Sequence, residues 1–468
     1  MTDWRDAVLA DVTPLNRPGT DRPGSTPASG DAVRVGAGRI GDADVVVAVW
    51  DFSVYGGSFG EHDASLFALA CNEAAASGRP LVSLVRSGGT RLQEGMRALV
   101  GIPRALLALD RLAESGVGHV AVVDHPTTGG VWVAVGARAD VRIGVAGATV
   151  GFSGPRVIEA MTGVAIGPGA NTAESAGAAG LLDAVLRPDE VVDRLAQVVA
   201  VLQPDDPVAS SISPSPVGVP DRTGWEQVLT SRNASRPDGV ELLAGVLADP
   251  VALAATDDST AAAVGRLGGR RVVAAAVAAH RDRFTTVAGY RLLTRAAELA
   301  GRWGVGLVLL VDTAGADPLP ASEQGGVAGA IADAARAVLG CAGPTLSVVH
   351  GAGGSGGALA AAVTDLVAVT EHAWFAALGP EGAAAALRRP VEQVVEQMGI
   401  TPRELLASGF ADTLAPGDAG PLAGWLAARL ESLHAVPRGE RLAARRERWS
   451  APLPGSPRTS APDPPDIA

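Results

Sequence analysis

The stretch LSVVHGAGGSGGA, residues 346–358, runs from an apolar segment directly into a cluster of glycines. Three other apolar segments end in a similar way, at LVSLVRSGG (residues 81–89), VAVVDHPTTGGV (residues 120–131) and LVLLVDTAG (residues 307–315). Short apolar runs are typical of buried strands, and glycines directly after a strand let bare backbone N–H groups approach a ligand. The sequence therefore predicts strand-to-helix turns that can point N–H groups at a ligand oxygen.

These turns belong to an internal repeat, because their partners lie about 226 residues apart. The match extends beyond the glycines, since Gly-Arg-Ile-Gly at 38–41 and Gly-Arg-Leu-Gly at 265–268 each precede an apolar strand. Helices are predicted at matching places in the two halves, over residues 64–76, 92–114 and 131–137 and over residues 289–303, 325–339 and 357–363. We therefore predict two tandem α/β domains related by the repeat.

Composition sets the expected domain boundaries. Two segments, residues 31–202 and residues 225–437, alternate predicted strands and helices and form the two expected domains. The stretch at residues 203–224 is rich in Pro and Ser and is typical of a linker. Residues 1–30 are predicted to be a disordered lead-in, and residues 438–468 a mostly disordered tail.

Charge and cysteine content exclude several classes of protein. A net charge of −12 argues against a nucleic-acid partner, and no apolar run is long enough to predict a membrane span. Cys71 and Cys341 are the only cysteines, so neither a disulfide framework nor a four-cysteine zinc site can form, and no metal site is predicted. The acidic N-terminus lacks the layout of a signal peptide, and we therefore expect a cytoplasmic protein.

The chain contains no lysine, and all 38 of its Lys-plus-Arg residues are arginine. Covalent attachment of biotin, a Schiff base with pyridoxal phosphate and the phosphate-binding P-loop each require a lysine side chain. We therefore predict no covalently bound cofactor of these kinds, and any biotin must come from a separate protein.

Motifs in both halves resemble the carboxyltransferase component of biotin-dependent acyl-CoA carboxylases, a branch of the crotonase-like superfamily. Half one is similar to the beta subunit through DFS (51–53), GGSFGE (56–61), SGGTRLQE (87–94), PTTGGV (126–131) and GFSGPRVIE (151–159). Half two is similar to the alpha subunit through GYR (289–291), DTAGA (312–316), GGSGGAL (353–359) and GPEG (379–382). The likeness covers roughly residues 30–435 and implies a fusion of the two subunits with two tandem crotonase-like (ClpP/crotonase) domains.

The resemblance implies two oxyanion holes that stabilise an enolate without a protein base. Four backbone positions would form the acyl-thioester hole of half one, namely Gly88, Gly89, Gly129 and Gly130. Four more would form a hole in half two for the ureido carbonyl of carboxybiotin, namely Ala314, Gly315, Gly356 and Gly357. The carboxyl group would pass from carboxybiotin to the α-carbon of acetyl-CoA or a related acyl thioester, and would give malonyl-CoA, a precursor of fatty acids and polyketides, or a relative.

The resemblance also implies partners. Biotin would arrive on a biotin carboxyl carrier protein served by a biotin carboxylase, and the acyl group on coenzyme A or an acyl carrier protein. Because sites in this family form between half one of one subunit and half two of another, we expect a homodimer or larger oligomer.

Departures from the family pattern affect the polar rim of the site. His125 stands where the beta motif usually has Asp, Ala352 stands where the alpha motif usually has an acidic residue, and the four-cysteine zinc ribbon is missing. The basic run before Gly-Tyr-Arg is reduced to Arg281 and Arg283.

Five side chains near the holes are candidates to contact the substrate, namely Arg86, Arg91, His125, Arg156 and His350. Each has a plain alternative: Arg91 can form a helix-start ion pair with Glu94, the other two arginines can pair on the surface, and the two histidines can face solvent or support the loops.

Two other functions remain open. The same holes would suit a biotin-independent decarboxylase of malonyl-CoA or malonyl-carrier protein, in which CO₂ leaves and the enolate is stabilised. A chain that keeps the glycines but has lost their polar partners could instead be a non-catalytic scaffold subunit of a carboxylase.

Overall fold

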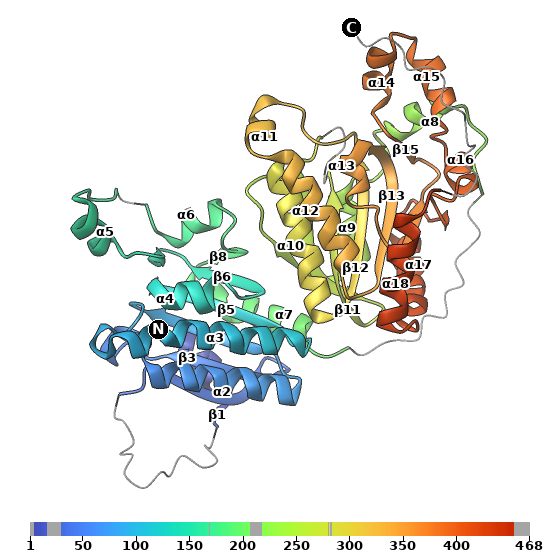
Figure 1. The fold of residues 1–468 in the computed structure, drawn as a ribbon. Coiled ribbons are helices and arrows are strands. Elements are labelled where there is room, and N and C mark those ends of the chain that lie inside the picture. The colour runs from blue at the N-terminus through green and yellow to red at the C-terminus, as the bar shows by residue number, and fades with distance from the viewer. Residues whose placement is uncertain are drawn as a thin grey trace.

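The structure is a computed structural model that describes residues 4–15, 30–167, 169–205, 218–278, 280 and 283–453. It consists of two α/β halves, each built on one mixed sheet covered by helices (Figure 1). The predicted pair of tandem α/β domains is confirmed. Within the described ranges, no helix combines the length and the apolarity that a membrane span would need.

The first half contains an eight-stranded sheet in the order β1-β2-β3-β4-β5-β6-β8, with β7 paired to β5. Its strands are β1 (Val12–Pro14), β2 (Val33–Ile40), β3 (Ala43–Trp50), β4 (Leu81–Ser87), β5 (His119–Thr128), β6 (Val141–Val145), β7 (Val150–Gly151) and β8 (Ala184–Leu186). The first three strands are antiparallel to one another, and β3 to β6 are parallel. The carboxyl ends of β4 and β5 therefore meet at one edge of the sheet.

The second half repeats this sheet strand for strand in the order β9-β10-β11-β12-β13-β14-β16, with β15 paired to β13. Its strands are β9 (Ala248–Leu253), β10 (Thr260–Leu267), β11 (Arg270–Val277), β12 (Gly306–Thr313), β13 (Thr345–Gly354), β14 (Leu366–Val369), β15 (Trp374–Ala376) and β16 (Thr413–Leu414). Every residue of β12 is buried, as expected for a parallel strand covered on both faces.

The principal helices also match. The pair α2 (Glu61–Ser77) and α3 (Met96–Glu114) covers one face of the first sheet, and α10 (Val287–Trp303) with α12 (Val327–Gly340) covers the second (Figure 1). The remaining α-helices are α1 (Trp4–Leu9), α4 (Gly129–Val131), α5 (Pro155–Thr162), α6 (Ala173–Ala178), α7 (Val191–Leu202), α8 (Gly224–Ser231), α9 (Gly239–Val246), α11 (Pro320–Gln324), α13 (Ser355–Leu359), α14 (Pro380–Leu387), α15 (Val391–Met398), α16 (Pro402–Ala407), α17 (Ala419–His434) and α18 (Arg438–Ser450).

Three predicted helices differ from the structure. The helix expected over 357–363 begins earlier and ends at Leu359. The helix expected over 92–114 is divided, because Gly95 adopts a positive φ that separates a short 3₁₀ turn at Leu92–Glu94 from α3. The helix expected over 131–137 is largely a π-helical turn, Trp132–Gly136. Turns of this kind inside helices often lie at functional sites, and this one follows the predicted glycine turn directly.

Parts of the two expected disordered ends belong to the fold. Between residues 4 and 15, β1 pairs with β2, and the buried Arg5 donates hydrogen bonds to the carbonyls of Trp50 and Leu84. At the other end, α18 lies inside the predicted tail and packs on the second half (Figure 1). Residues 4–14 and α18 are therefore ordered parts of the two end segments. The rest of the lead-in (1–3 and 16–29), the linker interior (206–217) and the tail beyond 453 lie outside the described residues.

The two halves are joined by a buried polar interface. Arg295 of α10 binds Asp183 of half one with two hydrogen bonds of 2.7 and 2.8 Å. Asp140 receives hydrogen bonds from Arg302 and from the Trp303 indole. Burial alone would raise the pKa of Asp183, but hydrogen bonding and charge from Arg295 outweigh it, and the pKa is lowered. The ionised form of Asp183 is therefore part of the native interface.

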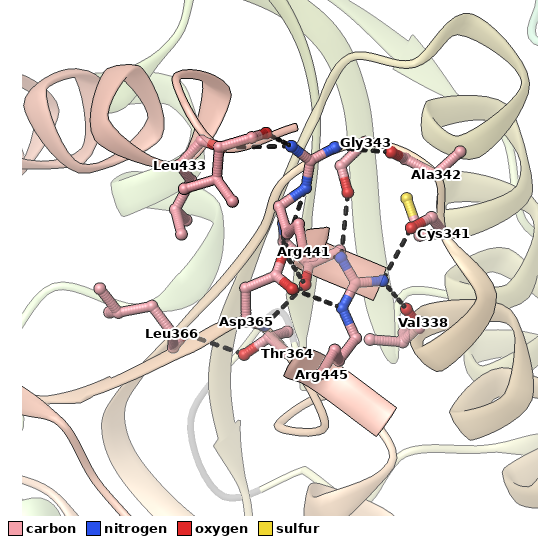
Figure 2. A network of polar contacts seen from close by, with 12 residues as sticks. Val338, Cys341, Ala342, Gly343, Thr364, Asp365, Leu366, Leu433, Arg441 and Arg445 are labelled. Atoms are coloured by element: carbon pink, nitrogen blue, oxygen red, sulfur yellow. Dashed lines mark hydrogen bonds and ion pairs between the residues drawn. The ribbon is translucent and has the colours of Figure 1, made fainter. Parts of the chain in front are cut away.

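A second buried network attaches α18 to the second half (Figure 2). Arg445, whose side chain is fully buried, donates to both carboxylate oxygens of Asp365 at 2.7 and 2.6 Å. Its remaining donors reach backbone carbonyls at the end of α12 and in the loop that follows, including that of Cys341 at 2.7 Å. Arg441 donates to the Ala342 carbonyl at 2.8 Å. One guanidinium thus satisfies carbonyls that the helix end leaves without partners.

The buried His119 predicts a pH-dependent stability of the first half. Burial lowers the pKa of its imidazole to about 4, although Asp140 opposes the shift. The unfolded chain takes up this proton near pH 6.5, so stability falls as the pH drops from about 6.5 to about 4, by roughly 3 kcal/mol. We expect His119→Gln to reduce this slope in urea denaturation across that range, because His372 and His434, whose pKa values are also lowered by burial, contribute the rest. Asp183, whose pKa is lowered, changes the stability only at a pH low enough to protonate an ordinary carboxyl. An unchanged slope in His119→Gln would therefore contradict the prediction.

Replacing Arg445 should strongly destabilise the second half. Arg445→Met removes the two guanidinium hydrogen bonds of the buried Asp365 carboxylate, which keeps only Thr345 and a longer ion pair with Arg441. Together with the lost hydrogen bonds to several carbonyls, this should cost about 3–5 kcal/mol in free energy of unfolding by urea. Arg446→Met changes an exposed arginine of the same helix and should stay within about 0.5 kcal/mol of the original protein. Equal effects of the two changes would show that α18 does not depend on this network.

Candidate active site

The first glycine turn brings the ends of β4 and β5 into backbone contact. Gly89 has a φ of 109° and Gly129 a φ of 61°, and both values disfavour any residue with a side chain. A Cβ placed on Gly129 would lie 3.0 Å from the Gly89 Cα, and one on Gly89 would lie 3.3 Å from the Gly129 Cα. We call the backbone of Gly88, Gly89, Gly129 and Gly130 cradle one.

Two N–H groups of cradle one are used by the fold itself. The Gly88 N–H donates to the Gly56 carbonyl at 2.9 Å, and the Gly129 N–H donates to the Phe152 carbonyl at 2.9 Å. The Gly89 N–H donates only to the Ser87 hydroxyl, at 3.1 Å. For the Gly130 N–H, the described part of the chain offers no acceptor outside its own helical turn. Gly89 and Gly130 are therefore the N–H groups best placed to serve a ligand oxygen.

The second glycine turn has the same geometry at the ends of β12 and β13. Gly315 has a φ of 142° and Ser355 a φ of 60°. The Gly315 N–H donates to the Thr313 hydroxyl at 3.2 Å, as Gly89 does to Ser87. A Cβ on Gly356 would meet no atom within 4 Å, so this position faces open space. We call the backbone of Ala314, Gly315, Gly356 and Gly357 cradle two.

Cradle two carries side-chain oxygens at its centre. The Ser355 Oγ accepts the Gly357 N–H at 3.3 Å, and a Cβ on Gly315 would lie 3.1 Å from the same oxygen. A Cβ on Gly357 would overlap the hydroxyl of Tyr290, which belongs to α10. Residue 357 must therefore be glycine, because the Tyr290 hydroxyl occupies the space that a side chain at this position would need.

The structure assigns most of the five candidate side chains to other contacts. Arg91 is buried and binds Asp63, Glu94 and the Ser58 carbonyl. The helix-start ion pair considered for Arg91 and Glu94 is thus present, at 2.9 Å. Arg86 is half-buried and binds Asp124. These contacts favour a structural role for both arginines.

The two histidines lie in different environments. His350 is buried under cradle two, where its Nδ1 lies 3.0 Å from Arg236. His125 is exposed at the rim of cradle one, and its Nδ1 accepts the Thr149 N–H at 3.2 Å. Arg156 is exposed on α5, while Arg281 lies outside the described residues. His125 and Arg156 remain the candidates that are open to a ligand.

Sequence reasoning missed the residue that fixes the floor of cradle two. Arg236 donates to Asp312 at 2.6 Å, to the His350 carbonyl at 3.0 Å and to the Ser231 carbonyl. Asp312 in turn accepts the Ala352 N–H at 2.7 Å and so ties β12 to β13. Arg236 lies outside every motif, and only the fold brings it here. Within the described ranges, no group of three His, Cys, Asp or Glu side chains is arranged to hold a metal ion.

Comparison with known proteins agrees with this geometry. A family described as "Acetyl co-enzyme A carboxylase carboxyltransferase-like" matches residues 221–423. A "Probable biotin-dependent acyl-coenzyme A carboxylase beta3 subunit" of Mycobacterium bovis is 34% identical over 440 residues, which cover 90% of this chain and 88% of that protein. The chain belongs to the biotin-dependent acyl-CoA carboxylase carboxyltransferase family.

Other members and solved structures support the order of the halves. The "Acetyl-coenzyme A carboxylase carboxyl transferase subunits beta/alpha" of Salinispora tropica is 34% identical over 417 residues, 82% of this chain and 73% of that one. The transcarboxylase 12S structure shares the fold, with a TM-score of 0.76 over 93% of this chain and 89% of that chain at 23% identity. The carboxyltransferase fold therefore spans both halves.

The two adjacent glycines of cradle one should respond differently to alanine. Gly89→Ala places a Cβ against Gly129 at a strained φ, so we expect loss of roughly 1–3 kcal/mol of stability and at least about 100-fold in carboxyltransferase rate. Gly88→Ala is the matched control, because its Cβ would meet only the Gly56 carbonyl oxygen at 3.5 Å and half two carries Ala314 at the equivalent position. Equal loss of carboxyltransferase rate in both variants would contradict the assignment of the Gly89 N–H, rather than the Gly88 N–H, to the ligand oxygen.

Proposed function

We propose that this chain transfers a carboxyl group between carboxybiotin, carried on a separate protein, and the α-carbon of an acyl-CoA thioester, with acetyl-CoA and malonyl-CoA as the pair. The observation that carries the proposal is the repetition of the cradle. Both halves present two glycine-rich turns at the ends of adjacent parallel strands, with positive φ values at matching positions. A transfer between two carbonyl compounds requires two such sites in one enzyme.

The chemistry assigned to cradle one is stabilisation of an enolate. Removing or adding a carboxyl group at the α-carbon places negative charge on the thioester oxygen. The N–H groups of Gly89 and Gly130 are fixed by the fold before the substrate arrives, and each such donor is worth about 3 kcal/mol in the transition state. No side chain in cradle one is needed as a base, in keeping with the plain glycine lining.

Cradle two is assigned to the carboxyl donor. Its Gly356 faces open space, and a ureido oxygen bound next to this glycine would gain charge as the carboxyl group leaves. Carboxybiotin supplies the carboxyl group when its carrier is bound. Because the chain has no lysine, biotin cannot be attached to it, which supports a separate carrier protein.

Exposed apolar side chains around cradle one support an assembly of several chains. Phe152 is 70% exposed and Met161 80% exposed, and the Phe152 carbonyl accepts a hydrogen bond from cradle one. Leu92 and Met96 are also exposed just after Gly89. These side chains suit an acyl-CoA chain together with half two of another copy, which would exclude water from the enolate.

The test uses the reverse reaction with purified protein, malonyl-CoA and free biotin. We expect acetyl-CoA to form only when biotin is present, and its rate to saturate with biotin. Acetyl-CoA formation without biotin would contradict transfer and would instead identify a decarboxylase. Methylmalonyl-CoA in place of malonyl-CoA tests the acyl chain, and faster conversion of the larger thioester would overturn the choice of acetyl-CoA.

A further inference from the structure

Tyr290 is one of only two tyrosines in the chain, and its hydroxyl is buried without a use in the fold. Its side chain is 0% exposed, and its oxygen has no well-aligned hydrogen-bond partner in the described ranges. The Thr285 side chain lies near enough to oppose the effect of burial on the Tyr290 pKa, but burial outweighs it. Burial raises the pKa of this phenol, so it stays protonated. A buried hydroxyl without a partner typically costs about 1–3 kcal/mol, whereas phenylalanine would fill the same space at no such cost.

The hydroxyl is aimed at cradle two. A Cβ on Gly357 would overlap the Tyr290 oxygen, and would also lie 2.7 Å from the Ala316 nitrogen. The Gly357 N–H itself donates to the Ser355 Oγ at a long 3.3 Å. Two hydroxyl groups therefore lie next to the same glycine, and one of them has no hydrogen-bond partner among the described residues.

Cradle one contains neither hydroxyl. Because α2 and α10 are both 17 residues long and begin at equivalent positions, Tyr290 corresponds to Ala64 in half one. Ser355 corresponds to Gly129, and Gly357 to Val131, at the ends of the matched ten-residue strands β5 and β13. The repeat has thus replaced a Val–Ala pair by a Gly–Tyr pair. The Gly–Tyr pair fills roughly the same volume as the Val–Ala pair. Packing therefore accounts for the tyrosine ring but not for its hydroxyl group.

We propose that Tyr290 is a positioning residue of cradle two that acts through Ser355. When the carboxyl donor binds, the Tyr290 hydroxyl donates to the Ser355 Oγ and takes the place of the Gly357 N–H. The Gly357 N–H is then free for the ureido oxygen, and the Ser355 hydroxyl donates to the carboxylate of the same ligand. A carboxylated urea offers more acceptor oxygens than a thioester enolate, which explains why only half two needs the two hydroxyls.

This inference rests on the proposed function, and kinetics of the full-length protein with malonyl-CoA and free biotin test it. We expect Tyr290→Phe to raise the KM for biotin about tenfold and to leave the KM for malonyl-CoA unchanged. Tyr55→Phe removes the other tyrosine hydroxyl, which belongs to half one and is exposed, and should change neither KM. Thermal unfolding of Tyr290→Phe should not occur at a lower temperature, because an unpaired buried hydroxyl is lost.

A double-mutant cycle separates this relay from a merely structural role. Because Tyr290 acts through Ser355, Tyr290→Phe should have no further effect on the KM for biotin once Ser355→Ala is present. Additive effects of the two changes, or equal increases in both KM values, would overturn the relay.

Fluorine NMR gives a readout that does not depend on turnover. With 3-fluorotyrosine in place of tyrosine, the protein has two signals, and Tyr55→Phe identifies that of Tyr290. Saturating free biotin should shift the Tyr290 signal and leave the Tyr55 signal in place. A shift in a protein that transfers no carboxyl group would keep this inference and reject the proposed function. An unmoved Tyr290 signal would reject the inference, whether or not the protein is active.

Discussion

The close approach of two backbone segments at the end of each sheet is the constraint on which the site depends. In half one, Gly89 and Gly129 lie within van der Waals distance of each other at φ values of 109° and 61°. The parallel pairing of β4 with β5 brings these residues together, and the register of the pair shifts at Ser87, just before the turn. Any side chain in this contact would push the strands apart. The glycines are therefore needed first for the fold, and the exposed N–H groups follow from the same geometry.

Sequence reasoning found this constraint because glycine leaves a clear local signal. It located the ends of β4, β5, β12 and β13 and the correspondence between the halves, since repetition strengthens a pattern that is weak alone. It did not locate Arg236, Arg445 or Asp183, because their partners are distant in the chain and each looks like an ordinary surface charge. It also did not locate α18, because the helix is rich in charge and its buried arginines resemble solvent-facing ones. Burial of a charge depends on a partner that only the fold supplies.

The absence of lysine shapes how this chain satisfies its backbone. Arg236, Arg441 and Arg445 are each buried and donate to backbone carbonyls. Arg236 and Arg445 also donate to a carboxylate, and Arg441 forms a longer ion pair with Asp365. A guanidinium has five donors in a rigid plane, so one side chain can bind a carboxylate and several carbonyls together. A lysine ammonium could not reach the same set. Arginine therefore serves here as a cross-link between segments, both under cradle two and at the end of α12.

The two halves share a frame, but their cradles are not equivalent. Half one keeps glycine at 129, the position where half two has Ser355 at a φ of 60°, a conformation that costs a residue with a side chain about 1–2 kcal/mol. Half two also keeps the buried Tyr290 hydroxyl without a partner among the described residues. Both features cost stability, and both lie against Gly357. If both cradles bound the same kind of oxygen in the same way, the lining of half one, which costs less stability, would be enough for both. The extra hydroxyls are therefore better explained by the proposed carboxylated urea, which has more oxygens to satisfy than a thioester has, than by a second thioester.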